Sequence, residues 1–195
     1  RLPPIEGAAQ LAASAEDAAA QQHRAVKLRG RWSAAHTVYL DNRQMDGRPG
    51  FYVLTPLRLT DGSAVLVQRG WQQRDFQDRT RTAPVPTRDG EIEVQGRIAP
   101  PPARLYEFSA AEAGPIRQNL ALDAFARETG LVLRPLTVLL ADTPASVGDG
   151  LQRHWPVASS GVAKNQGYAA QWFGLSALIV VLYVWYQFIQ PRRRA

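Results

Sequence analysis

The sequence contains no cysteine among its 195 residues. Disulfide bonds, cysteine-based zinc or iron–sulfur sites and thiol-dependent copper handling are therefore excluded. A domain in an oxidising compartment can do without disulfides when its hydrophobic core is large enough, and about 140 residues suffice to bury one. The lack of cysteine restricts the chemistry of the protein but does not assign it to a compartment.

Signatures of catalysis are also lacking. The chain has three histidines, His23, His36 and His154, and carries no zinc-protease, P-loop, nucleophile-elbow or dinucleotide-binding motif. His36 and Asp41 can be combined on paper with a serine into a triad, but single residues of these types on a hairpin are far more often surface polar groups. We therefore expect no catalytic residue, no metal site and a protein that is not an enzyme.

Acidic residues are absent from the last 32 positions, since all 17 precede residue 164. Four of the 23 basic residues, Lys164 and Arg192–Arg194, lie in this terminal part, so residues 1–163 hold 19 basic against 17 acidic groups. Residues 1–163 thus carry a net charge of only +2, and the other four charges of the formal +6 flank the C-terminal segment, where lipid headgroups would meet them. This distribution favours a lipid bilayer as partner and argues against nucleic acid.

Charge is missing altogether between Asn165 and Pro191. As a helix, Ala169–Ile189 would be about 31 Å long, and a bilayer core is about 30 Å thick. Trp172 near one end and further aromatic residues near the other resemble an aromatic belt. A buried core helix is the alternative, but such helices are rarely apolar all round. The sequence predicts a transmembrane helix over 164–190, followed by a basic tail over 191–195.

The expected topology follows from the arginines at the C-terminus. Basic residues beside a span favour the cytoplasmic or matrix side, which places residues 25–163 in the periplasm or the intermembrane space. The sequence starts at Arg1 without an apolar run, so we expect a first transmembrane helix before Arg1 in the full-length protein. The prediction is a multi-pass protein of the bacterial inner membrane or the mitochondrial inner membrane.

The extramembrane part is predicted to be mainly β. Residues 1–24 are rich in alanine and glutamine and indicate a short solvated helix or linker. Residues 25–163 contain one amphipathic helix, Asn119–Thr129, with Asn119 as N-cap and Gly130 at its end. Short runs of strand character are separated by turn residues, which favours a small antiparallel sheet or barrel with one or two short helices. These runs are Ala25–Trp32, Thr37–Leu40, Phe51–Leu59, Ala64–Arg69, Glu91–Ile98 and Leu131–Leu140.

Several motifs, taken together in order and spacing over residues 24–190, resemble the Surfeit locus protein one family. They are Leu40-Asp41-Asn42-Arg43, Arg69-Gly70-Trp71, Trp155-Pro156, Gly167-Tyr168-Ala169 and Gln171-Trp172-Phe173. The resemblance implies a non-enzymatic assembly factor for haem-copper terminal oxidases, with two transmembrane helices flanking the domain. It also implies that the protein handles or retains haem a for insertion into cytochrome c oxidase subunit I, so subunit I or its assembly intermediates are the expected partners.

The resemblance further implies where haem a would bind. The family's proposed haem ligand is a histidine at the position of Asn165, and asparagine is not a usual axial ligand of haem iron. The expected cofactor-binding residues are this position with Tyr168, Gln171 and Trp172, and His154 is an alternative ligand. At helical spacing Tyr168, Gln171 and Trp172 share one face, which fits either a cofactor or an ordinary aromatic belt packed on another helix.

Arg69, Gly70 and Trp71 are a candidate partner surface, although a Gly-Trp pair at a strand end is equally typical of a core plug. Two other functions stay open at this point. One is a haem-independent membrane scaffold that binds subunit I during assembly. The other is an unrelated membrane-anchored extracytoplasmic enzyme.

Overall fold

The structure is a computed structural model that describes residues 2–78, 81–103, 105, 114–144, 146, 148–155, 162–185 and 187. Within the last helix, the side chains of residues 162–168, 170 and 184 are not described. The basic tail predicted over 191–195 lies outside the described residues. The chain divides into two compact units, Arg1–Trp155 and Pro156–Ala195, which we treat separately.

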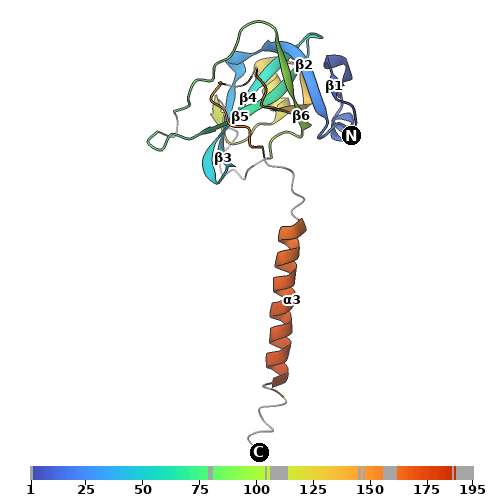
Figure 1. The fold of residues 1–195 in the computed structure, drawn as a ribbon, viewed down its shortest axis with the longest axis vertical. Coiled ribbons are helices and arrows are strands. Elements are labelled where there is room, and N and C mark those ends of the chain that lie inside the picture. Colours follow the sequence, from blue (N-terminus) through green and yellow to red (C-terminus); the bar gives the residue numbers. More distant parts are fainter. Residues whose placement is uncertain are drawn as a thin grey trace, which may run out of the picture. The chain divides into compact units, whose positions relative to one another are not determined.

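The first unit is built on a closed β-barrel, so the mainly-β prediction is confirmed (Figure 1). Around the barrel, β2 (Ala25–Trp32) pairs with β6 (Ile92–Ala99), then β8 (Leu133–Leu140), β5 (Ala64–Gln73) and β4 (Arg48–Leu59). The barrel closes where β4 pairs again with β2. Most pairs are antiparallel, as expected, but β5 and β8 run parallel.

Further strands extend the sheet beyond the barrel. β3 (Val38–Met45) pairs with β4, while the two-residue strands β1 (Ile5–Glu6) and β7 (Ile116–Arg117) lie at the sheet ends. Short helices connect the strands. They are η1 (Ala8–Gln10), α1 (Ala15–Ala20), η2 (Ala34–His36) and α2 (Leu122–Thr129).

The barrel closes at Gly30, which pairs with Ile92 of β6 and with Leu59 of β4. A Cβ atom at this position would overlap the carbonyl oxygen of Arg58. Glycine therefore allows β2 to bend from one neighbouring strand to the other, as barrel corners require.

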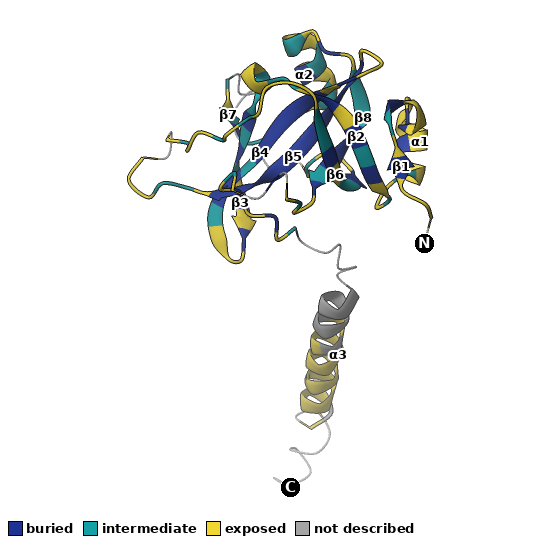
Figure 2. Cartoon of the chain, turned by 45° about the horizontal axis from the view of Figure 1, so that its top comes forward, coloured by how far each residue is buried: buried dark blue, intermediate teal, exposed yellow. Residues whose placement is uncertain are grey.

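Two hydrophobic clusters stabilise this unit, and β5 contributes side chains to both because its residues point alternately to its two faces. Val65 and Val67 point into the barrel cluster, while Leu66 points the other way, into a second cluster beneath Phe125 of α2. This alternation is the two-residue period of a strand whose faces are both covered, and Figure 2 shows that β5 is buried along its length.

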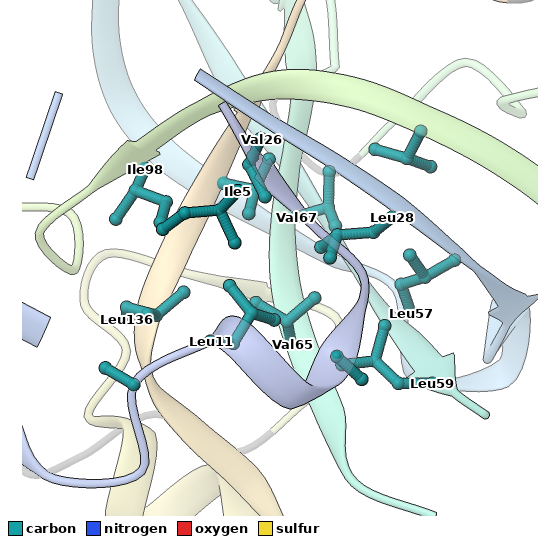
Figure 3. Packing of buried hydrophobic residues seen from close by; sticks show 14 of the residues in the cluster. Ile5, Leu11, Val26, Leu28, Leu57, Leu59, Val65, Val67, Ile98 and Leu136 are labelled. Carbon is teal, nitrogen blue, oxygen red and sulfur yellow. The ribbon is translucent and has the colours of Figure 1, made fainter. Parts of the chain in front are cut away.

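The N-terminal segment closes one side of the barrel cluster. Ile5 and Leu11 are 1% and 4% exposed and lie against barrel residues such as Val65 and Leu136 (Figure 3). The expected short helix forms as α1, with Ala18 its one buried residue, but the segment also packs against the barrel through Ile5, Ala8, Leu11 and Ala12. Leu2, at 71% exposed, takes no part in this contact.

The second unit contains α3 (Val162–Val184), so a helix does form in the segment expected to be helical. Its described side chains are exposed, including those of Trp172, Phe173 and Val180. The sequence predicted a transmembrane helix over 164–190. Among the residues that the structure describes, no helix has the combination of length and apolarity that a membrane span needs.

Candidate functional site

The motifs at the end of β5 and at 151–155 come together in the first unit. Trp71 and Gln152 form an isolated antiparallel bridge, with backbone N–H···O distances of 2.7 and 2.8 Å. A Cβ atom on Gly70 would lie 2.6 Å from Cβ of Leu151. Glycine at position 70 is therefore what allows the segment 151–155 to lie directly on β5.

Trp71 is a core residue in this arrangement. Its side chain is 1% exposed, and its indole Nε1–H donates to the backbone carbonyl of Arg43 over 2.9 Å. Arg69 and Gly70 are also buried. The structure thus places the predicted partner residues inside the domain, the arrangement expected of a core plug. Their role in binding a partner stays a prediction.

An aromatic and cationic stack joins β3, β4 and the segment before the second unit. The guanidinium of Arg43 lies 6.0 Å from the ring centroid of Tyr52, which lies edge-on against Trp155 at 5.4 Å. Trp155 donates its indole N–H to the carbonyl of Leu140 over 2.9 Å. Burial raises the pKa of Tyr52 and lowers that of Arg43. Trp155 of the Trp155-Pro156 motif is thus fixed to the barrel, while Pro156 is outside the described residues.

His154 forms a surface pair with Asp46. Its Nδ1 lies 2.7 Å from a carboxylate oxygen of Asp46, in the turn between β3 and β4, and both side chains are more than half exposed. The hydrogen bond to Asp46 raises the pKa of His154. The neighbouring Arg153 is buried and forms ion pairs with Asp142 and Asp149, so the 151–155 segment is held to the barrel on both sides of its backbone.

A cavity of about 380 Å³ adjoins the start of the Arg69-Gly70-Trp71 motif. Its lining includes the half-buried Trp32 and the buried Arg69 and Leu140, together with the exposed Arg88 and Asp89 of the loop after β5. The guanidinium of Arg69 lies 4.9 Å from the ring centroid of Trp32. No local sequence pattern indicates this cavity, because its walls come from β2, β5, β6, β8 and two loops.

Ligands for a metal or a haem iron are scarce in the described part of the chain. No group of three or more histidine and carboxylate side chains that could hold a metal ion occurs there. Asn165 does not fit the role of axial ligand, since haem iron takes histidine, cysteine, methionine or tyrosine. His154 fits better in chemistry, because a ligating histidine usually bonds its second ring nitrogen to a carboxylate, as Nδ1 does here with Asp46.

The other expected cofactor-binding residues belong to the second unit. Asn165 and Tyr168 lie in α3, but their side chains are not among those described, whereas Gln171 and Trp172 are exposed. The side chains of Gln171 and Trp172 are thus accessible for contact with a cofactor, another helix or lipid. The shared face predicted for Tyr168, Gln171 and Trp172 stays a prediction.

Comparison with known proteins places these motifs in a family context. The profile of the SURF1 family matches residues 1–177. A SURF1-like protein of Rickettsia conorii is 28% identical over 174 residues, which cover 83% of this chain and 68% of the relative. One from Rickettsia felis is 26% identical over 173 residues, covering 83% and 72%. One from Dictyostelium discoideum is 42% identical over 50 residues, covering 26% and 18%.

Proposed function

The chain belongs to the SURF1 family, and from this we propose that it is a non-enzymatic assembly factor for cytochrome c oxidase. Membership of the family implies a role in the assembly of cytochrome oxidase. In our proposal the protein holds haem a on its way into subunit I and contacts subunit I or an assembly intermediate that contains it. The observation that carries the proposal is the family match over residues 1–177, which takes in the whole barrel and most of α3.

The proposed haem ligand in the first unit is His154. Its exposed ring has one nitrogen engaged with Asp46, which leaves Nε2 for an iron. Asp46 would orient the ring, and Trp155, next along the chain, is anchored by its bond to Leu140 and keeps the backbone of His154 in place. When bound, haem a would supply a redox-active iron that needs axial ligands.

We further propose that the protein is held in a bacterial or mitochondrial inner membrane as a multi-pass protein, with the barrel in the periplasm or intermembrane space. The sequence supports this, because no charge occurs between Asn165 and Pro191 and three arginines follow. The described side chains of α3 are apolar for most of their length and are exposed. When residues 1–195 are expressed without a further span, a Val180→Arg substitution should weaken retention in alkali-washed membranes, whereas Val180→Leu should leave the protein there.

A second candidate function is a scaffold that binds subunit I without haem. The observation that favours it is Asn165, since the residue at the family's ligand position cannot serve as an ordinary axial ligand. The two candidates share the partner and differ only in the cofactor. A single purification can therefore separate them.

The experiment is a pyridine haemochrome spectrum of the full-length protein, purified from cells that make haem a, together with a search for subunit I in the eluate. Stoichiometric haem a that is lost in His154→Ala and kept in His36→Ala supports the first candidate. Subunit I without haem supports the scaffold. Normal oxidase content in a strain that lacks the protein would contradict both.

A further inference from the structure

Arg69 is a buried cation to which the described part of the chain offers no ion-paired carboxylate. The residue is 4% exposed, and among the described residues no ion pair joins it to an acidic side chain. Its two Nη atoms donate to the hydroxyl of Thr87 and the carbonyl of Pro86, over 2.7 and 2.8 Å. The third nitrogen, Nε, is buried and finds no hydrogen-bond partner among the residues that the structure describes. A buried charge of this kind is ordinarily paired, because neutral acceptors offset only part of its desolvation.

Asp149 is the candidate ion-pair partner of Arg69, but its carboxylate already accepts hydrogen bonds from other groups. It lines the same cavity and partly opposes the effect of burial, which lowers the pKa of Arg69. Its oxygens, however, accept from the guanidinium of Arg153 and from the backbone N–H of Leu151. Asp149 thus acts electrostatically on Arg69, but in the described structure its ion pair is with Arg153.

Part of the lining of the cavity next to Arg69 is apolar. Trp32, Ile92, Val94 and Leu140 line it beside the guanidinium, and its volume of about 380 Å³ admits a small organic molecule. At the border, Glu93 is neutralised by Lys27, at 3.0 Å. The exposed lining residues Arg88, Asp89 and Glu91 add one cation and two acids, so the attraction for an anion comes from the buried Arg69.

We propose that this cavity binds a small molecule or group that joins an anionic end, a carboxylate or a phosphate, to a flat or aliphatic apolar body. The anion would lie at Arg69, whose planar guanidinium suits both oxyanions, and the apolar body would contact Trp32 and Leu140. Thr87 and Pro86, on the loop after β5, accept the guanidinium hydrogen bonds that an anion would otherwise accept. This binding site does not depend on the proposed role in oxidase assembly.

The first test uses the unaltered full chain in detergent micelles. Benzoate and phenyl phosphate are titrated while the arginine Nε–H signals are followed by NMR, with benzyl alcohol as the neutral probe of the same shape. We expect the Arg69 signal to shift and saturate with benzoate, phenyl phosphate or both, at millimolar or lower concentration. The stronger of the two identifies a carboxylate or a phosphate as the natural anionic end. No saturable shift, or an equal shift with benzyl alcohol, would overturn the proposal.

The second test compares two substitutions by titration calorimetry with the stronger probe. Arg69→Gln removes the inner cation and keeps a hydrogen-bonding side chain, while Arg88→Gln removes the cation at the border. We expect at least a tenfold loss of affinity in the first and less than a threefold change in the second. Equal losses would mean attraction by general charge and would overturn the assignment to Arg69. Where Arg69→Gln fails to fold, the NMR titration of the unaltered chain decides alone.

Discussion

The indole nitrogen of Trp71 donates a hydrogen bond of 2.9 Å to the carbonyl oxygen of Arg43, across a strand that lies between them. Arg43 on β3 pairs with Gly50 on β4, and Trp71 belongs to β5 on the other side of β4. A Cβ atom on Gly50 would come 2.5 Å from the Trp71 ring. The indole therefore lies over the glycine and links β3 to β5 directly.

Trp71→Phe should lower the free energy of unfolding by about 1–3 kcal/mol, because the phenyl ring fills less of the buried space than the indole and the donor to the Arg43 carbonyl is lost. Urea unfolding of the full chain in detergent micelles measures it. Phe76→Leu is the control, since Phe76 is 78% exposed and should change stability by less than about 0.5 kcal/mol. An unchanged urea midpoint for Trp71→Phe would show that the indole hydrogen bond contributes nothing to stability.

Gly50→Ala should be destabilising by about 1–3 kcal/mol, since the new methyl group would clash with the backbone carbonyl oxygen of Gln72 and with the Trp71 ring. Gly174→Ala is the control, because nothing lies within 4 Å of a Cβ atom there. The clash makes the two sites interdependent. Gly50→Ala should therefore cost less in a Trp71→Leu background than in the unaltered chain, and equal costs in the two backgrounds would contradict the packing described.

Local patterns predicted the strands well. The alternation of apolar and polar residues over Ala25–Trp32 gives the bounds of β2 as observed. Pro135 is accommodated within β8, opposite the register shift between β5 and β8. Gly130 ends α2 in the left-handed conformation, as predicted, with φ of 68°. These features depend on a few neighbouring residues, so the sequence alone can specify them.

Features that depend on distant residues could not be predicted in the same way. Asn119 was expected to cap α2, but the N-cap is Ala121, and the Asn119 side chain bonds the backbone N–H and carbonyl of Leu105 instead. The pair of His154 and Asp46 joins positions 108 residues apart. The cavity beside Arg69 likewise needs the closed barrel, which no local pattern specifies.

The pair of His154 and Asp46 should make stability depend on pH. Asp46 raises the pKa of folded His154 above its ordinary value of 6.5. The contribution of this pair is therefore complete below pH 6.5 and is lost as the pH rises through the higher pKa of the folded state. NMR titration of the imidazole should show that Asp46→Asn lowers the pKa of His154, while the remote Glu16→Gln leaves it in place. An equal pKa in the unaltered chain and in Asp46→Asn would contradict the pairing.

Acid should lower the stability of the first unit by protonating Glu128, which forms an ion pair with Arg117. Arg117 is buried and donates to both Glu128 oxygens, over 2.9 Å each, so the hydrogen bonds lower the pKa of Glu128 below its ordinary value of 4.5. Glu128→Gln should reduce the free energy of unfolding by about 1–3 kcal/mol at neutral pH, since it leaves the buried guanidinium without its anion. A group with a lowered pKa stabilises fully above its unfolded value, here 4.5, and loses this contribution as the pH falls through the folded value. Urea unfolding at neutral pH and at progressively lower pH should therefore show the variant and the unaltered chain converging in acid. A difference that persists unchanged below the folded pKa would mean that the substitution acts by altering the packing of α2 and not through the charge of Glu128.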